Sequence, residues 1–172
     1  TANTMACVSE AIGLALPGSA GAPAPYETRD EYAYESGRAV MELIKNGGPR
    51  PRDIVTRKAL ENAAAVVAAT GGSTNGALHL PAIAHEAGID FDIFDVAEIF
   101  KRTPYIADLK PAGKYVASDM FEVGGVSVVL QQLLEGGYLH GDCMTVTGKT
   151  QEENLRDIKL PEDQDVIYPI KK

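Results

Sequence analysis

Four Gly-Gly pairs divide this 172-residue sequence into short segments, and they limit what the chain can form more than any other feature. Glycine ends helices readily, because it adopts the left-handed backbone conformation without a steric penalty. Between the pairs, apolar residues recur mainly at helical spacing. The pairs are Gly47-Gly48, Gly71-Gly72, Gly124-Gly125 and Gly136-Gly137. The sequence therefore predicts several short helices that stop at tight glycine turns.

Two helices are predicted before the first glycine pair. Residues 1–16 form an amphipathic helix with Met5, Val8, Ile12 and Leu16 on related faces. The Gly/Pro/Ala-rich stretch that follows cannot continue it. A second helix starts at Thr28, whose hydroxyl can accept from a free backbone N–H, with Glu31 completing a capping box. Its apolar stripe consists of Ala33, Gly37, Val40, Met41 and Ile44.

Two more helices are predicted in the middle of the chain. Thr56 can cap a helix whose many alanines permit close packing against a neighbour, and this helix stops at Gly71-Gly72. The next helix begins near Ser73 or Thr74 and closes at Gly88. Pro81 must then sit in its first turns or kink it.

The remainder of the chain mixes short helices with short extended runs. Asp95 can cap a helix over 96–102, a helix follows Gly124-Gly125, and Thr150 with Glu153 can open another. Extended segments are predicted at 90–93, 105–109, 143–148 and 166–170. Together these patterns predict an α/β fold, a helix-rich layered α/β/α domain with a small, mostly parallel sheet.

The acidic charge balance excludes two classes of partner. Acidic residues outnumber basic ones by 24 to 16, which gives a formal net charge of −8. No positive surface is therefore expected for nucleic acid or for an anionic membrane. No apolar run approaches the roughly 20 residues of a membrane span, and no signal-peptide pattern is present. We expect a soluble, cytoplasmic protein.

The two cysteines do not form a recognisable metal site. Cys7 and Cys143 stand alone, without a CxxC pair or a histidine at ligand spacing. They are expected to be free thiols, and no metal ligand is assigned within this sequence.

The segment Gly71-Gly72-Ser73-Thr74-Asn75 is the best candidate for a binding site. Its glycines allow a backbone to approach a ligand, and its hydroxyls and amide lie beside free N–H groups at a helix start. A carboxylate or phosphate would be favoured there by directed hydrogen bonds and by the helix dipole. The alternative, a glycine C-cap followed by a serine N-cap with no binding role, stays open.

Five motifs in order resemble the dihydroxy-acid and phosphogluconate dehydratase family. They are TANTMACVSEAIGLALPGS, RDIVTRKALENA, ATGGSTNGALHLPAIAHEAGI, ADLKPAGKY and GDCMTVTGKT. The resemblance extends over essentially the whole chain. RDIVT, DLKPAGKY and TVTGKT are more similar to the dihydroxy-acid branch than to the sugar-acid branch.

This resemblance implies a hydro-lyase that converts 2,3-dihydroxy-3-methyl acids to 2-oxo acids in valine, isoleucine and leucine biosynthesis. It implies an iron-sulfur cluster that acts as a Lewis acid, a magnesium ion that polarises the substrate, and a homodimer. In the family, the cluster cysteines lie before the segment equivalent to Thr1. The catalytic base lies in a later domain, so no catalytic residue is assigned in this chain.

The resemblance also implies where this chain belongs in the family's architecture. Residues 1–172 correspond to part of the N-terminal α/β domain, incomplete at both ends, and the C-terminal β-rich domain is absent. Thr1, Asn3 and Thr4 are expected to contact the surroundings of the cluster. Gly71, Gly72, Ser73, Thr74 and Asn75 are expected to line the substrate or cluster pocket.

Two other functions remain open at this point. The chain can be a fragment of an aldonate or phosphogluconate dehydratase, or a stand-alone anion-binding module. As a fragment it would bind no cofactor and lack activity by itself. Surfaces that meet absent parts would be exposed, so an apolar patch, self-association or marginal stability is predicted.

Overall fold

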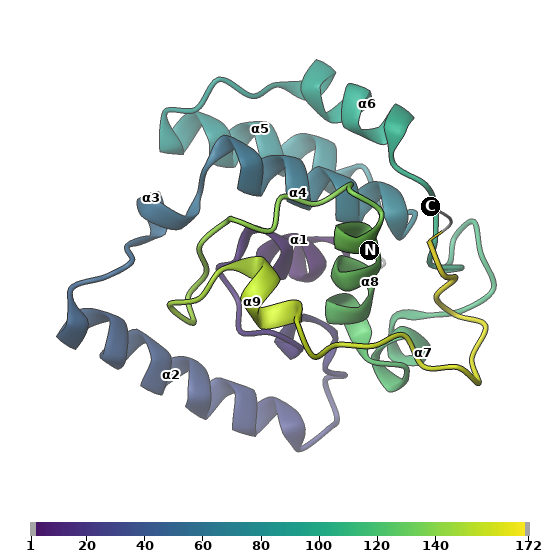
Figure 1. The fold of residues 1–172 in the computed structure, drawn as a ribbon, viewed down its shortest axis with the longest axis horizontal. Helices are drawn as coiled ribbons and strands as arrows, with labels where there is room; N and C mark the ends of the chain where they lie inside the picture. The colour runs from purple at the N-terminus through teal and green to yellow at the C-terminus, as the bar shows by residue number, and fades with distance from the viewer. Residues whose placement is uncertain (1–2, 171–172) are drawn as a thin grey trace.

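Helix α1 (Thr4–Ile12) lies at the centre of the fold, and several of the other helices pack against it (Figure 1). The structure is a computed structural model that describes residues 3–170. In chain order its other elements are the 3-10 helix η1 (Ser19–Gly21), α2 (Thr28–Asn46), α3 (Pro51–Ile54), α4 (Arg57–Ala69), α5 (Asn75–Ala87), α6 (Ile93–Arg102), α7 (Ala117–Glu122), α8 (Gly125–Glu135) and α9 (Gln151–Leu155).

The composition of α1 explains its central place. Cys7, Val8, Ala11 and Ile12 are each at most 1% exposed, and α1 packs against α4, α5 and α8. A helix that is apolar on most sides must be covered on most sides. The prediction that α1 continues to Leu16 is wrong, because Gly13 adopts φ 98° and ends the helix after three turns or fewer.

The predicted alanine-rich helix is confirmed as α4. Thr56 caps it, with the Thr56 hydroxyl accepting from Ala59 N at 3.2 Å. Its buried alanines let α1 and α6 lie close against it, as small side chains allow. The fully buried alanines of α4 are Ala59, Ala63, Ala64, Ala65 and Ala69. One hydrophobic core therefore runs from α1 through α4 to α8.

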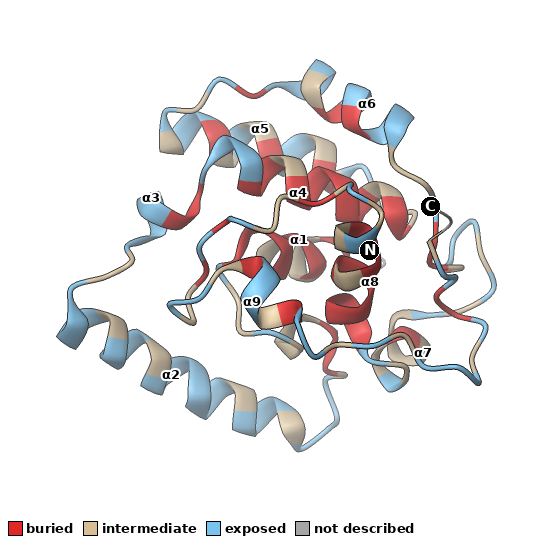
Figure 2. Cartoon of the chain, in the orientation of Figure 1, coloured by how far each residue is buried: buried red, intermediate tan, exposed pale blue. Residues whose placement is uncertain are grey.

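Helix α2 stands apart from this core. It has no buried residue, and Figure 2 shows it in the colours of exposed and intermediate residues. Thr28 does not cap it, because the first turn already begins at Tyr26 and Glu27, whose carbonyls accept from Arg29 and Asp30. Within residues 3–170 no helix, α2 included, is both long and apolar enough to cross a membrane.

The helix-rich prediction is confirmed, but the small parallel sheet does not form within residues 3–170. That range contains only the isolated bridges Ala107↔Ile167, Leu109↔Tyr115 and Met144↔Thr150. The backbone groups find other partners: Ile106 and Ala107 both donate to Ala69 O at the end of α4. Segments 105–109 and 166–170 also exchange two backbone hydrogen bonds, from Asp108 N to Val166 O and from Tyr168 N to Ile106 O, but this pairing stops at one bridge. The apolar runs predicted as strands are therefore mainly loops.

The other helix predictions are confirmed with small shifts. Helices α5, α8 and α9 form where predicted, and Thr150 and Glu153 make the predicted capping box. Helix α6 begins earlier than predicted, because Asp92 is its N-cap and Asp95 completes the box three residues later. The short helices α3 and α7 were not predicted.

Candidate functional site

The two groups of predicted site residues meet at one place. The turn between α4 and α5 lies against the start of α1, and Ser73 N donates to Thr4 Oγ1 at 3.0 Å. Thr4 is 2% exposed. The motifs TANTM and ATGGSTN, about 70 residues apart in sequence, are therefore joined by a partly buried hydrogen bond.

The glycines of this turn are required by close contacts. Gly71 has φ +61°, and a Cβ there would lie 2.7 Å from Cε2 of Tyr105. A Cβ at Gly72 would lie 3.0 Å from Val67 Cγ1 and 3.1 Å from Thr4 Oγ1. Gly71 therefore needs both the left-handed conformation and the missing side chain, whereas Gly72 needs mainly the space.

Tyr105 is a neighbour of the turn that sequence analysis did not identify. Its ring covers Gly71, and its hydroxyl donates to Leu109 O at 3.2 Å. The following residues, Ile106 and Ala107, are fixed to Ala69 O by two hydrogen bonds of 3.0 Å. Tyr105 lies two residues before the ADLKPAGKY motif, but nothing in that motif shows that this segment folds over the glycine turn.

Polar groups line the start of α5. Ser73 Oγ accepts from Asn75 N at 3.4 Å, while Thr74, the N-cap residue, makes no side-chain capping bond. Neither α1 nor α5 has an acidic residue in its first turn. Two positive helix ends therefore lie close together without acidic side chains of their own to offset them, and such an environment favours an anion.

Asn3 has a structural role in this arrangement. It is the N-cap residue of α1, has φ 56°, and donates from Nδ2 to Ala20 O at 2.7 Å. It thereby ties the 3-10 segment to the start of α1. The predicted role of Thr1 lies outside the described residues.

Glu10 was not identified from the sequence, although it organises the same side of α1. It is 3% exposed. Its Oε1 accepts from Gly18 N at 2.9 Å and from Ser127 Oγ at 2.8 Å, and its Oε2 accepts from Ala20 N at 3.2 Å. Burial raises the pKa of Glu10, and the three hydrogen bonds act in the opposite direction. This carboxyl group holds the η1 loop and α8 against α1.

A hollow of about 650 Å³ lies beside this region, between α1, α3 and α5. Its lining is mainly apolar and also includes Arg52, His79 and Glu86. Residues 71–75 are not among its lining residues. This hollow is therefore not the pocket that the turn was predicted to line. The residues that line it are Met5, Pro51, Arg52, Val55, His79, Ala82, Ile83, Glu86 and Ala87.

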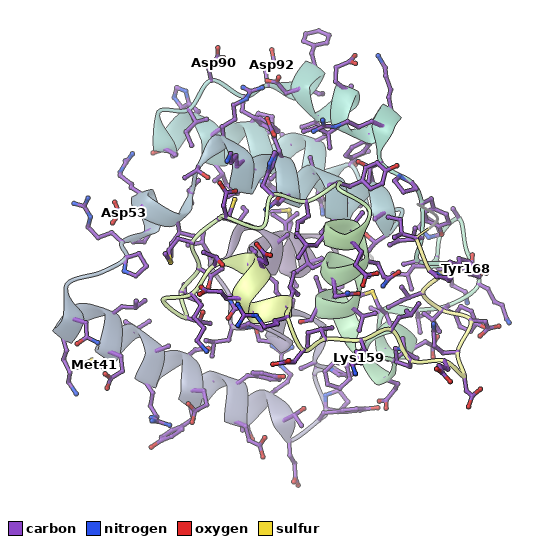
Figure 3. The ribbon with its side chains drawn as sticks, viewed as in Figure 1. Met41, Asp53, Asp90, Asp92, Lys159 and Tyr168 are labelled. Carbon is purple, nitrogen blue, oxygen red and sulfur yellow. The ribbon has the colours of Figure 1, made fainter. Side chains whose placement is uncertain are left out.

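The described residues do not fit an iron-sulfur cluster or a magnesium ion. Within residues 3–170 no three His, Cys, Asp or Glu side chains are grouped closely enough to share a metal. Burial raises the pKa of Cys7 to about 12 and that of Cys143 to about 11. Thiols must lose their proton to bind a metal, and these stay protonated at neutral pH. The acidic residues Asp90 and Asp92 stand beside the start of α6 (Figure 3), where Asp92 serves as its cap.

Replacing Thr4 by valine tests the junction between α1 and the turn. Valine keeps the shape but removes the acceptor for Ser73 N, so we expect a loss of about 1–2 kcal/mol in unfolding free energy and faster hydrogen exchange at the Ser73 amide. The matched control is Thr103→Val, whose hydroxyl donates to the Ile99 carbonyl that Thr103 N already contacts. Equal effects of the two variants would contradict this role for Thr4.

Comparison with known proteins places these features in one family. The family model described as "Dihydroxy-acid/6-phosphogluconate dehydratase N-terminal" matches residues 1–154. The chain is 75% identical over 99% of its length to a dihydroxy-acid dehydratase of Parvibaculum lavamentivorans, of which it covers 29%. It is 70% identical over its full length to dihydroxy-acid dehydratase 2 of Bradyrhizobium diazoefficiens, of which it covers 30%. A dihydroxy-acid dehydratase of Pelagibacter ubique is 68% identical over 97% of this chain, which covers 29% of that relative.

Proposed function

Since the chain belongs to the dihydroxy-acid/6-phosphogluconate dehydratase family, we propose that it is part of a dihydroxy-acid dehydratase. Such a hydro-lyase removes water from a 2,3-dihydroxy-3-methyl acid and yields a 2-oxo acid. The chain spans about 30% of the length of these relatives, so the activity is proposed for the longer protein. The observation that carries this proposal is the hydrogen bond that joins the TANTM and ATGGSTN motifs at one site.

The role proposed for this chain is to orient the substrate. A dihydroxy acid carries a carboxylate, and the starts of α1 and α5 together offer N–H groups and positive helix ends without acidic side chains of their own. Ser73, Thr74 and Asn75 can add hydroxyl and amide contacts. Gly71 and Gly72 let the turn pack closely against Tyr105 and Thr4, which fixes where these polar groups lie. Thr4 holds the turn in place, so it acts as a positioning residue.

Several further properties of the longer protein follow from the family resemblance and belong to this proposal. They are an iron-sulfur cluster and magnesium as cofactors, a homodimer, a cytoplasmic location, and a layered α/β/α domain that residues 1–172 help to build. The cluster and magnesium would supply Lewis-acid chemistry. Because residues 3–170 offer no ligand set for either, we expect the 172-residue chain alone to be inactive.

The substrate class is tested by assaying the longer protein on two kinds of acid. We expect turnover of 2,3-dihydroxy-3-methylbutanoate and little or none of gluconate or 6-phosphogluconate. Preferred turnover of a sugar acid would instead assign the chain to the other branch of the family. Micromolar binding of a simple carboxylate by the 172-residue chain, in a protein without dehydratase activity, would favour the stand-alone anion-binding module.

The substrate-orienting role is tested by truncating the polar side chains at the start of α5. Ser73→Ala and Asn75→Ala in the longer protein should each lower kcat/KM about tenfold, since each loses one hydrogen bond to an anionic substrate. Ser36→Ala is the matched control, because the Ser36 hydroxyl donates only to Tyr32 O on exposed α2. Unchanged kcat/KM in both site variants would contradict the role.

A further inference from the structure

Two Asn-Gly pairs occur in this chain, Asn46-Gly47 and Asn75-Gly76. An asparagine in such a pair can lose its side-chain ammonia spontaneously, because the glycine has no side chain to hinder ring closure between the two residues. The first pair lies at the end of α2, and the second opens α5 within the candidate site. The same reactive sequence therefore occurs in two different surroundings.

The Asn46-Gly47 pair is exposed and weakly held. Both residues lie at the end of α2 from which the chain turns toward α3 (Figure 1). A Cβ at Gly47 would meet nothing within 4 Å. Gly47 N donates to Ile44 O at 3.4 Å, which is longer than the usual range of about 2.7–3.2 Å. The Gly47 nitrogen is therefore open to solvent and only loosely engaged.

Ring closure at Asn46 requires little disturbance of the fold. The Asn46 backbone must rotate out of the helical conformation, so that the Gly47 nitrogen can approach Asn46 Cγ. Asn46 is the last residue of α2, so this rotation breaks only the capping bonds that follow it, from Gly47 N to Ile44 O and from Gly48 N to Leu43 O. Helix ends open locally at low free-energy cost.

The Asn75-Gly76 pair is held by its surroundings. Gly76 is buried, and a Cβ there would lie 3.1 Å from Val67 Cγ2 on α4. Gly76 N donates to Ser73 O at 3.1 Å. The rotation that ring closure needs would break this bond and displace the first turn of α5 from α4. Reaction at Asn75 therefore requires part of the packed core to open first.

We propose that Asn46 is a site of spontaneous deamidation, whereas Asn75 is protected by the fold. The Gly47 nitrogen gives its proton to solvent base and attacks Asn46 Cγ. The new N–Cγ bond closes a five-membered succinimide, and the side-chain nitrogen leaves as ammonia. Water then opens the ring. Hydrolysis at Cγ gives aspartate, and hydrolysis at the main-chain carbonyl carbon of residue 46 gives isoaspartate. No atom is oxidised or reduced, and water is the sole co-reactant.

The product changes the end of α2. It carries a carboxylate one turn after Glu42 and at the negative end of the helix, so both repel it. Isoaspartate also adds a methylene to the backbone, which displaces Gly48 N from Leu43 O, 2.9 Å away before the reaction. Asn46 lines a hollow of about 540 Å³ between α2 and the segment 144–148. Deamidation should therefore loosen the last turn of α2 beside that segment.

Peptide mass mapping of the longer protein, incubated at neutral pH in the folded and the denatured state, tests the proposal. In the folded protein Asn46 should deamidate at least about tenfold faster than Asn75, a ratio equivalent to ~1.4 kcal/mol of additional local opening at Asn75. In denaturant the two sites should react at similar rates, because both are Asn-Gly pairs. Asn75 thus serves as the internal control for Asn46.

Two variants of Asn46 test the chemistry and its consequence. Asn46→Gln should remove the reaction at this position, since the corresponding ring would have six members and forms far more slowly. Asn46→Asp supplies one product directly and should speed hydrogen exchange at the Gly48 amide. It should leave kcat/KM of the longer protein unchanged, because Asn46 lies outside the candidate site.

Three results would overturn the proposal. The first is a folded protein in which Asn46 reacts no faster than Asn75, which would show that the longer protein holds this turn closed. The second is a rate at Asn46 that does not rise from neutral to mildly alkaline pH, since the attacking group is the deprotonated Gly47 nitrogen. The third is unchanged deamidation at position 46 in Asn46→Gln.

Discussion

Replacing Glu10 by alanine should lower the free energy of unfolding by about 3 kcal/mol. The change removes the acceptor of three hydrogen bonds, from Gly18 N, Ala20 N and Ser127 Oγ, at a side chain that is 3% exposed. Each donor left without a partner costs about 1–3 kcal/mol, reduced where water can reach it. Since domains of this size are stable by roughly 5–15 kcal/mol, the loss is large. Denaturant unfolding measures it.

A surface acid provides the matched control for this prediction. Glu98→Ala removes a carboxylate that is 70% exposed and contacts only Lys101, so its effect should stay within about 0.5 kcal/mol. If Glu10→Ala were as mild as Glu98→Ala, the Glu10 network would not hold η1 and α8 to α1 as described.

The same carboxyl group should produce a pH dependence of defined sign. Burial raises the pKa of Glu10 in the folded state above its ordinary value of 4.5. A raised pKa means that the stability contributed by the protonated form is complete below about pH 4.5 and is lost as the pH rises through the folded-state value. The stability of the wild-type chain relative to Glu10→Gln should therefore fall as the pH rises. Unfolding of both proteins from about pH 4.5 upward measures this difference, and a difference that shows no fall over that range would contradict it.

Replacing Gly71 by valine should distort the glycine turn and lower stability by about 3 kcal/mol. A β-branched residue at φ +61° costs about 1–3 kcal/mol, and the new side chain must also displace the Tyr105 ring, 2.7 Å from the Cβ position. If the turn orients the substrate, kcat/KM of the longer protein should fall at least tenfold at a temperature where the variant remains folded.

A valine at Gly88 distinguishes backbone strain from the side-chain clash as the cause of the lost stability. Gly88 has φ +72°, but a Cβ there would meet nothing within 4 Å. Gly88→Val therefore carries the backbone strain without the clash and should cost about half as much stability, with little change in kcat/KM. Equal loss of activity in the two variants would show that backbone strain alone, rather than the position of the turn, reduces catalysis.

Much of the helical structure could be predicted because its signals are local. Thr56 and Thr150 cap helices in the structure as the sequence indicated, and Gly88 ends α5 with a positive φ. Capping and glycine termination depend on residues within one turn, so they need no knowledge of the tertiary fold.

The strands could not be separated from buried loops by the same means. Residues 105–109 contain buried Ile106, Ala107 and Leu109, a pattern that suits a strand as well as a buried loop. What decides between them is the partner of each backbone N–H, and for both Ile106 and Ala107 that partner is Ala69 O at the end of α4. This contact joins segments far apart in sequence.

The site was predicted as two separate groups of residues, and the contact between the two groups was not predicted. The glycines and polar residues at 71–75 and the start of α1 were each singled out, but the bond from Ser73 N to Thr4 Oγ1 spans 69 positions. Glu10 and Tyr105 were not predicted as site residues, because their surroundings also depend on the tertiary fold. A lone glutamate in a helix looks exposed until the loop and helix that surround it are known.

The last contact of α1 has a consequence for how the chain acquires its structure during synthesis. Gln151 Nε2 donates to the carbonyls of Glu10 and Ala11, which lie 141 and 140 positions earlier. At about 5–20 residues per second, a ribosome needs roughly 7–30 s to add those residues. Throughout that interval α1 lacks its contact with α9, the last of its neighbours to be synthesised. Chaperones can therefore bind nascent α1 before α9 is available to cover it. Slow codons between α1 and α9 would prolong this exposure.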